Sequence, residues 1–562
     1  MIKNIIFAAL FLVASLSADE LKKTKVQVPT FPHEAAGIYS WCNWSPRKTN
    51  RQTAPDLRGV AIVLTWRKLE PREGEYKFDE RFGELLKQAH ENDYYVHTMI
   101  WVAPGTPKWL YEIGVPKVET DRKTNALGEA TNQTAFPYYF DALYQEKYFK
   151  LLKAWAQYID ALPEELHKRI LFVQSCEGST GDGWGYKGNP LDKKYAISRE
   201  QWDDYRIKVW GKMKKYFQEE VKRPLPIAVN SDANTEKSNL WLEQNLGDYG
   251  LKMGMSSHGY HVSENRDRLK AWEQTKASNG HHFSRGEMDG ELYKMNWSKR
   301  DVPIVLYWSG LFSLHMNLDV WNIPQGALVD SDNSHAFEFF NEYAPMRDPQ
   351  KSKKGFCALR KGLDASDTKE FPLAEFGSGK EMARFDKKRY ADIAEKFQAY
   401  GAQQNDTKSA MGGGMANRNR TGVNDVGWGI ISGNYERFVH QVKPDQSSQP
   451  WWSVDNSLYG RFTRSFGIKG GSMFFKLNEA FAKKAKKLKL TISYLDKGTG
   501  RWRVKTPQAG LKTIECKNSG EWKKAEFIYE FSAKANEEPA DFIIKKLSDE
   551  DVHFHLIEVE KL

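Results

Sequence analysis

Cysteine is scarce in this chain of 562 residues, which has four cysteines, at Cys42, Cys176, Cys357 and Cys516. No two of them stand in C-x-x-C spacing, which argues against a structural zinc site. A chain of this length can bury a core large enough to fold without disulfides. Cys176 ends an apolar run, so we expect a buried thiol there rather than a nucleophile.

Several motifs of well-known chemistry are also missing. The sequence has no P-loop, no H-E-x-x-H and no G-x-S-x-G, so phosphoryl transfer, zinc proteolysis and the α/β-hydrolase mechanism have no support. The first predicted strand-to-helix turn lacks a glycine-rich dinucleotide fingerprint, which disfavours a doubly wound sheet. We therefore expect neither a metal ion nor a cofactor.

Long apolar runs are missing after the amino terminus. Lys3, the apolar stretch 5–13 and the small residues 15–18 form the pattern of a secretory signal peptide, which we place at residues 1–18. The apolar stretch is too short to span a membrane, and no cysteine near the cleavage zone would take a lipid anchor. We expect an exported protein, periplasmic, at the cell surface or secreted, without stable membrane insertion.

Aromatic and basic residues are abundant. Aromatic residues make up 13% of the chain, with 19 Trp, and the formal charge is +10, from 83 basic and 73 acidic residues. Aromatic rings are platforms for sugars, although most aromatic rings fill cores. The basic charge suits an anionic partner, such as a sulfated or uronic polysaccharide or a membrane surface; a generally basic surface is the alternative. Export disfavours nucleic acid, and the oligomeric state stays open.

Apolar runs alternate with amphipathic stretches over roughly the first 345 residues. The runs predict eight strands, at 37–41, 60–66, 95–101, 170–176, 226–230, 252–259, 282–287 and 302–308. Helices are predicted at 78–92, 144–160, 199–220, 238–245, 264–277 and 335–343. Eight strands with intervening segments are typical of an α/β fold, the (β/α)8 TIM barrel, which we place at 30–360.

The remaining chain has a different pattern. Residues 361–423 form a helical and linker segment, with a helix at 386–400 and a glycine-rich stretch at 411–422. Short alternating runs then predict an antiparallel β-sandwich over 424–562, with strands at 462–466, 472–477, 488–495, 502–505, 525–531 and 552–559. The basic run 483–487 is expected in solvent. The sandwich either supports the barrel or binds carbohydrate, for which the candidates are Trp428, Trp451, Trp452 and Trp502.

Two carboxylates stand at predicted strand ends. Glu177 closes the fourth strand, before the glycine-rich stretch 178–185, and Glu287 closes the seventh. Carboxyl ends of barrel strands carry the chemistry of that fold. Hydrolysis of a glycosidic bond needs one protonated and one ionised carboxyl group. Arg285 favours the ionised form of Glu287, so we assign Glu287 as nucleophile and Glu177 as acid/base. The acidic neighbours that could replace them are Asp182, Asp289 and Glu291.

Two motifs carry a resemblance to a known group of enzymes. After the second predicted strand the chain reads Trp66-Arg67-x-Leu69-Glu70-Pro71-x-x-Gly74-x-Tyr76-x-Phe78-Asp79. After the third predicted strand it reads Pro104-x-x-Pro107-x-Trp109-Leu110. They resemble those of clan A barrel glycoside hydrolases, with family 42 and related β-galactosidases and galactan-degrading enzymes nearest. The resemblance covers the barrel alone. It implies an acid/base after strand four, a nucleophile after strand seven, and retention of anomeric configuration with carboxyl groups about 5 Å apart.

The resemblance also suggests which residues contact the sugar. Clan members often carry an arginine after strand two that supports the nucleophile, a tyrosine or histidine after strand six, and an indole after strand eight. Together with other polar and aromatic residues at predicted strand ends, the substrate-binding candidates are Arg67, Trp101, Asn230, His258, Tyr260 and Trp308. A weaker candidate is Trp184. The clan places Asn, which binds the sugar 2-hydroxyl, where this chain has Cys176, so either the sugar is substituted at that position or another side chain makes that contact.

The sequence therefore predicts a retaining glycoside hydrolase that cleaves β-glycosidic bonds in a polysaccharide or its oligosaccharides. Galactose-containing chains are the first expectation, including sulfated galactans of the agar, porphyran or carrageenan type. One alternative is a non-catalytic polysaccharide-binding protein on the same barrel. Another is a polysaccharide lyase, which would use a lysine, tyrosine or histidine base instead of two carboxylates.

Overall fold

The computed structural model describes residues 27–41, 43–103, 105–125, 132–181, 183–231, 233–253, 283–288, 290–293, 302–364, 367–377, 387–397, 405–406, 416–417, 426–427, 433–451, 463–467, 470–507, 510–532 and 540–562. The chain forms two compact units. One takes in the chain up to Phe31 together with Val63–His90 and His97–Gly250, and the other takes in Pro32–Ile62, Glu91–Val96 and Leu251–Leu562. The predicted signal peptide lies outside the described residues.

Eight strands close into a barrel, which confirms the predicted fold class. They are β1 (Gly37–Ser40), β2 (Gly59–Thr65), β3 (Tyr95–Trp101), β6 (Ile170–Gln174), β7 (Ile227–Asn230), β8 (Gly250–Met253), β9 (Phe283–Glu287) and β10 (Val320–Ile323). Their order around the barrel is β1-β10-β9-β8-β7-β6-β3-β2, and the registers of β1 with β2 and β10, and of β6 with β7, are parallel. Strands such as β2 are buried along their whole length, because parallel barrel strands are covered on both faces.

The helices follow the strands as the alternating pattern predicts. They include η1 (His33–Ala35), α2 (Trp66–Leu69), η2 (Asp79–Gly83), α3 (Glu84–Glu91), α4 (Lys108–Glu112), α5 (Ala142–Ala161), α6 (Glu164–His167), η3 (Lys193–Tyr195), α7 (Arg199–Lys214), η4 (Lys215–Glu219) and α8 (Glu236–Asn245). Helix α7 begins with a reciprocal capping box between Ser198 and Gln201, which satisfies two backbone donors of its first turn. A hairpin, β4 (Lys117–Asn125) with β5 (Asn132–Pro137), fills the long loop after β3. The predicted helix at 264–277 lies outside the described residues.

The prediction for the eighth strand is wrong. Residues 302–308 open helix α10 (Val302–His315), and the strand is β10, four residues long. Helix α10 is buried on every side, with α12 (Ser334–Tyr343) and strand β16 (Tyr435–Arg437) in contact with it. A helix that is covered all round reads as a continuous apolar run, which is also the pattern of a buried strand.

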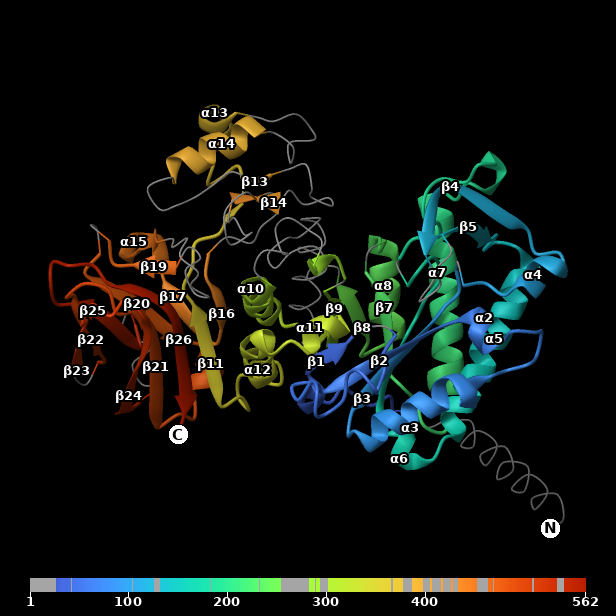
Figure 1. Cartoon of the computed structure of the whole chain (residues 1–562), viewed down its shortest axis with the longest axis horizontal. Helices are drawn as coiled ribbons and strands as arrows, with labels where there is room; N and C mark the ends of the chain where they lie inside the picture. The colour runs from blue at the N-terminus through green and yellow to red at the C-terminus, as the bar shows by residue number, and fades with distance from the viewer. Residues whose placement is uncertain are drawn as a thin grey trace, which may run out of the picture. The chain divides into compact units, whose positions relative to one another are not determined.

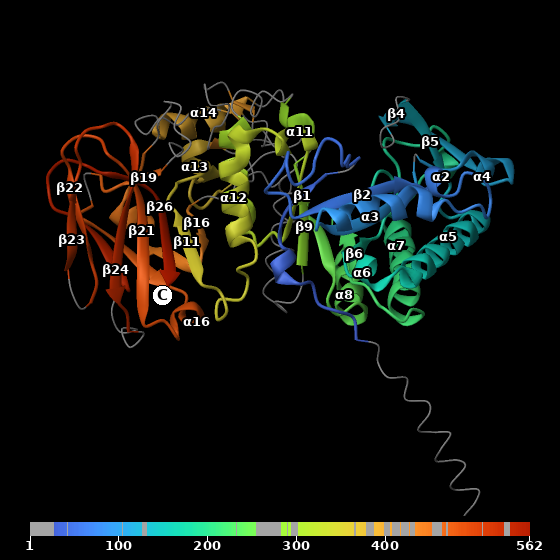
Figure 2. The same ribbon diagram turned by 60° about the horizontal axis from the view of Figure 1, so that its bottom comes forward.

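Further short helices complete this part of the chain: η6 (Gly290–Tyr293), α11 (Gln325–Leu328), η7 (Ser331–Asn333), α13 (Leu373–Phe376) and α14 (Lys387–Lys396). The last of these corresponds to the predicted helix at 386–400, and α12 to the predicted helix at 335–343. Figure 2 shows α12 between strand β1 and strand β11 (Lys354–Ala358). Helix α12 therefore packs against a barrel strand on one side and lies beside an antiparallel sheet on the other.

Two antiparallel sheets form the sandwich, drawn mostly in orange and red in Figure 1. One sheet joins β11, β16, β18 (Gln449–Trp451), β19 (Thr463–Ser465), β21 (Lys487–Leu495), β24 (Trp522–Glu530) and β26 (His553–Lys561). The other joins β17 (Val439–Val442), β20 (Ser472–Leu477), β22 (Arg501–Lys505), β23 (Gly510–Glu515) and β25 (Phe542–Lys546). All six predicted sandwich strands are present. Strand β11, which the sequence did not predict, pairs with β26 although it lies inside the range 30–360 expected for the barrel.

Short elements occupy the rest of the described carboxyl-terminal half: the strands β12 (Leu363–Asp364), β13 (Asn405–Asp406), β14 (Ala416–Asn417) and β15 (Val426–Gly427), and the helices α15 (Pro444–Ser447) and α16 (Glu479–Ala482). Lys483 and Lys484, which begin the predicted basic run, are exposed after α16. Among the described residues, none of the helices has the length and apolar character that crossing a bilayer requires.

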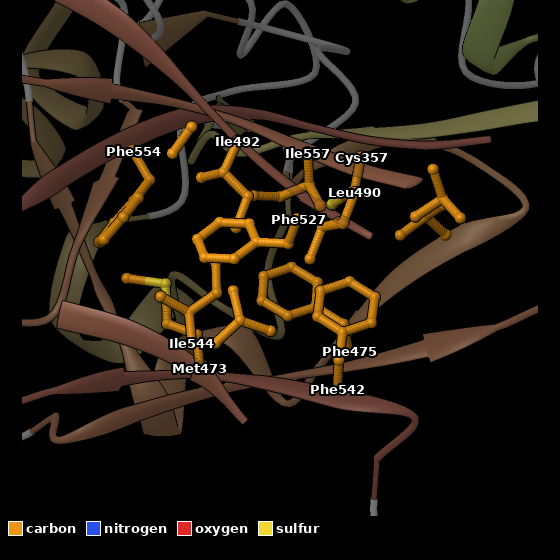
Figure 3. Packing of buried hydrophobic residues seen from close by; sticks show 14 of the residues in the cluster. Cys357, Met473, Phe475, Leu490, Ile492, Phe527, Phe542, Ile544, Phe554 and Ile557 are labelled. Atoms are coloured by element: carbon orange, nitrogen blue, oxygen red, sulfur yellow. The ribbon is translucent and has the colours of Figure 1, made fainter. Parts of the chain in front are cut away.

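Aromatic and aliphatic side chains from both sheets form one core in the sandwich (Figure 3). The rings of Phe475 and Phe542 stack with their centroids 4.9 Å apart. Trp502 is fully buried and lies 5.1 Å from Phe554 and 5.9 Å from Phe527, centroid to centroid. Since both faces of Trp502 are covered by the core, this indole has no face for a sugar. Trp428 and Trp452 lie outside the described residues.

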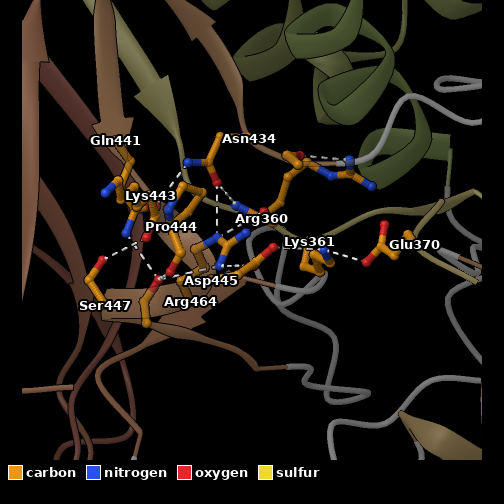
Figure 4. A network of polar contacts seen from close by, with 12 residues as sticks. Arg360, Lys361, Glu370, Asn434, Gln441, Lys443, Pro444, Asp445, Ser447 and Arg464 are labelled. Carbon is orange, nitrogen blue, oxygen red and sulfur yellow. Dashed lines mark hydrogen bonds and ion pairs between the residues drawn. The ribbon is translucent and has the colours of Figure 1, made fainter. Parts of the chain in front are cut away.

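A partly buried network of charges joins the end of β11 to α15 and β19 (Figure 4). Arg464 donates through Nε to the carbonyl of Arg360 at 3.0 Å and through Nη1 to Asp445 at 3.0 Å. Lys361 forms ion pairs with Asp445 at 3.0 Å and with Glu370 at 2.6 Å. Burial by itself would raise the pKa of Asp445, but Arg464 and Lys361 outweigh it and lower that pKa.

Candidate active site

Glu287 ends strand β9 and is held by two cations. Both Nη1 and Nη2 of Arg285 donate to its Oε2, at 3.0 and 2.9 Å. Arg285 and Glu287 are two residues apart on one strand, so their side chains share a face. Nζ of Lys252, on strand β8, lies 3.1 Å from Oε1. Two cations around one carboxylate stabilise its charged form, which a nucleophile requires.

Arg285 is itself held from its other side. Its guanidinium carbon lies 4.4 Å from the centre of the Trp41 ring, a cation–π distance. Trp41 directly follows strand β1, and the neighbouring strand β10 places Asn322 level with Glu287 in the register. Nδ2 of Asn322 donates to the carbonyl of Ser40 at 3.0 Å. The residues around Glu287 thus come from strands β1, β8, β9 and β10.

Glu177 lies three residues beyond strand β6 and is fully buried. Its Oε1 accepts a hydrogen bond from Nε1 of Trp210 at 2.5 Å, and its Oε2 lies 3.5 Å from Nε of Arg206. Both partners are on helix α7, and their side chains stack with the Arg206 guanidinium 4.7 Å from the Trp210 ring centre. A cation and an N–H donor stabilise a carboxylate, whereas a general acid has to hold a proton.

Oε2 of Glu177 accepts no hydrogen bond from any described residue. Arg206 approaches it as an ion pair only, because the Nη1 and Nη2 groups of that arginine donate to Asn234 and to the carbonyl of Asn230. A buried carboxylate oxygen normally has a hydrogen-bond donor. One acceptor position at Glu177 therefore stays available to a donor other than the described side chains.

Cys176 is a buried thiol, as predicted. Its backbone carbonyl accepts a hydrogen bond from Tyr148 at 2.9 Å. The glycine-rich loop that follows is packed too closely for a side chain at Gly178, where a Cβ would lie 2.3 Å from the carbonyl oxygen of Trp184. The loop therefore needs glycine at position 178 in order to pack beside Glu177.

The same loop joins two of the predicted binding residues. Nδ2 of Asn230, at the end of strand β7, donates to the carbonyl of Gly181 at 2.8 Å. Gly181 also lies against Trp101, the last residue of β3, so that a Cβ there would be 2.7 Å from the indole Nε1. That Nε1 is buried and has no hydrogen-bond partner among the described residues. Trp101 and Asn230 are thus brought together around Gly181.

Arg67 lies in the first turn after strand β2, in helix α2, and is half-buried. Its backbone N–H donates to the carbonyl of Gly105 at 2.9 Å. Burial raises the pKa of the nearby Tyr111, and the charge of Arg67 partly opposes that rise. The support that the resemblance implies from Arg67 to the nucleophile stays a prediction.

Trp308 requires a correction. It lies within helix α10, not at the end of a barrel strand, and is fully buried. Its ring packs 5.3 Å from that of His555 and 6.4 Å from that of Tyr435, both in the sandwich. An indole buried between a helix and a sheet cannot form the floor of a sugar site.

Several other candidates cannot be placed. His258, Tyr260, Asp182 and Asp289 lie outside the described residues, and of Glu291 only the backbone in η6 is described. Trp184 is 44% exposed. No group of three or more metal-binding side chains occurs among the residues that the structure describes.

Four residues of these two clusters were not predicted: Trp41, Lys252, Arg206 and Trp210. A lysine inside the apolar run Gly250–Met253 is the one visible signal, since a lysine in a buried strand needs an anionic partner. Nothing in the pattern of helix α7 distinguishes Arg206 from a solvent-facing arginine, because its partner lies 29 positions earlier in the chain.

Comparison with known proteins gives weak similarity to solved structures alone. No family model matches the chain, and no curated protein matches it. Among solved structures, the chain is similar to a β-galactosidase from the Antarctic haloarchaeon Halorubrum lacusprofundi, with 12% identity and a TM-score of 0.34 over 55% of this chain and 58% of that one. It is also similar to the tri-modular endo-β-1,4-glucanase B of Bacillus halodurans, with 11% identity and a TM-score of 0.35 over 57% and 62%.

The matched region spans less than two thirds of each of those solved chains. At these TM-scores the assignment of the barrel depends on the strand order of this chain itself.

Proposed function

We propose that this protein is a glycoside hydrolase that cleaves β-glycosidic bonds in a polysaccharide or its oligosaccharides with retention of configuration. The observation that carries the proposal is the environment of Glu287, a carboxylate at the end of barrel strand β9 whose two oxygens face Arg285 and Lys252. This arrangement suits a nucleophile that attacks an anomeric carbon. The motif that begins at Trp66-Arg67 supports the same class of reaction.

In this proposal Glu177 is the acid/base. It would donate a proton to the leaving oxygen and then take one from water. The oxygen Oε2, which accepts no hydrogen bond from the described residues, is the one that could exchange a proton with substrate. Since Glu177 is fully buried, this role requires a change at the glycine-rich loop that follows it.

The substrate class is a further part of the proposal. The resemblance to galactan-degrading enzymes supports a galactose-containing chain, and the net charge of +10 supports an anionic one, such as a sulfated galactan of the agar, porphyran or carrageenan type. The amino-terminal pattern supports action outside the cytoplasm. Trp101 and Asn230 are the binding residues proposed on the unit that contains Glu177.

One observation favours a second candidate function, a polysaccharide-binding protein without turnover. The Arg206 ion pair and the Trp210 hydrogen bond hold Glu177 in a covered position. If Glu177 served only to form a structural ion pair, Glu287 would be the one carboxylate of the pair left for catalysis, and hydrolysis needs two. Such a protein would bind the same polysaccharides and release no product.

The test is a screen of sulfated and neutral β-linked galactans and of aryl β-glycosides, with reducing ends measured as product. Glu287→Gln should lose at least about 1,000-fold in kcat. Glu177→Gln should lose activity on the polysaccharide but retain much of it on aryl glycosides whose leaving group needs no proton. Glu526→Gln, which removes a surface ion pair with Lys489, is the control. Turnover that survives in both site variants would refute the mechanism, and binding without product would establish the second candidate.

A further inference from the structure

Each oxygen of the Glu287 carboxylate faces its own cation. Arg285 places two donors on Oε2, and Lys252 approaches Oε1. The side chains of Lys252 and Arg285 are 6% and 1% exposed, and that of Glu287 is 13% exposed. The lysine is thus held among barrel side chains, on strand β8, rather than lying over the site from solvent.

The two cations act differently on the carboxylate. Both donors of Arg285 converge on a single oxygen, so this contact fixes the position of Oε2. The contact of Lys252 with Oε1 holds the second oxygen, and the positions of both oxygens together set the orientation of the carboxylate plane. A nucleophile reacts efficiently only when its lone pair is aimed at the reacting carbon, so the orientation of this plane affects the rate.

We infer that Lys252 is a positioning residue for Glu287, which fixes the plane of the carboxylate while Arg285, stacked on Trp41, fixes its other oxygen. This inference rests on the proposed function. Lys252 acts through Glu287 and forms no bond to the sugar in this assignment. Its removal should therefore reduce the rate of the chemical step more than the binding of the substrate.

The test compares Lys252→Met, which keeps the length of the stem and removes the charge, with Lys252→Arg, which keeps the charge. We expect Lys252→Met to lower kcat by about 10-fold to 100-fold, the range for a charge-assisted hydrogen bond, with KM changed less than threefold. Lys252→Arg should recover most of the loss. Lys489→Met, which removes a surface lysine paired with Glu526, should leave kcat unchanged. A loss confined to KM, or no rescue by arginine, would overturn the inference.

A second measurement does not depend on turnover. If Lys252 and Glu287 interact as described, the change in Tm caused by Lys252→Met in the parent protein should shrink or change sign in the Glu287→Gln background, because the charge of Glu287 is then absent. Equal Tm changes in both backgrounds would refute the contact. Coupling with no turnover in the parent would refute the proposed function and leave the contact standing.

Discussion

Arg206 and Glu177 form an ion pair that is closed to solvent, with Nε 3.5 Å from Oε2 and no exposed surface on either side chain. The pair connects helix α7 to the end of strand β6, where the candidate acid/base lies. Removing the arginine would leave a buried carboxylate without its cation. The consequences of this pair and of three other features can be measured.

We expect Arg206→Met to destabilise the protein by about 3–5 kcal/mol, the cost of an uncompensated buried charge. The double variant Arg206→Met/Glu177→Gln should regain part of that stability, since it has no charge to compensate. Urea unfolding, followed by tryptophan fluorescence, measures the free energy of unfolding of the single and of the double variant. An Arg206→Met protein as stable as the parent would show that the two side chains do not interact.

Trp41 should matter to the site through Arg285. Replacing it by Leu removes the cation–π contact, a kind of contact that is worth about 0.5–2 kcal/mol, and we expect kcat/KM to fall by about 10-fold. Trp41→Phe keeps an aromatic face under the guanidinium, so the kcat/KM of this variant should fall less. Kinetics on one aryl glycoside compare the two variants; equal effects of Leu and Phe would contradict a role for the ring face.

Stability should depend on pH through His553. Burial lowers the pKa of His553 to about 4, and its ring lies 4.2 Å from that of Trp451. The unfolded state takes up a proton near pH 6.5, while the folded state does so only near pH 4, so stability is complete above pH 6.5 and falls as the pH decreases towards 4. At pH 5 the loss from this residue is about 2 kcal/mol.

Chemical denaturation at pH 7.5 and pH 5.0 tests this, because other groups contribute equally to the parent and to His553→Phe, which keeps a ring beside Trp451. The difference in free energy of unfolding between the two pH values should be smaller in His553→Phe. An identical pH dependence would show that His553 titrates normally in the folded protein.

The described thiols should be unreactive in the folded protein. Cys176, Cys357 and Cys516 are buried, and burial raises the pKa of Cys516 to about 11. A thiol that is covered and protonated reacts slowly with disulfide reagents. We expect at most one of the four cysteines to react with 5,5′-dithiobis(2-nitrobenzoate) in buffer and all four in urea. Three fast-reacting thiols in buffer would contradict the burial.

Most barrel strands could be predicted because each is a short apolar run ended by glycine or a polar residue, as at Ile170–Gln174. The error at Val302–His315 has a clear cause. Its apolar residues surround the helix axis, so no period of 3.6 is visible, and only the length of the run, 14 residues, favours a helix over a strand. The true strand, Val320–Ile323, is four residues long and carries little pattern.

The sequence by itself determined the alternation of strands and helices, the sandwich strands, the position of Glu177 and Glu287 at strand ends, and the arginine next to Glu287. These depend on residues near one another in the chain. Only the tertiary structure decided that Lys252 holds the second oxygen of Glu287, that Trp41 stacks on Arg285, that Arg206 and Trp210 cover Glu177, and that Trp308 is buried. Each of these depends on which side chains face one another across strands and helices, and hydrophobic periodicity does not encode that.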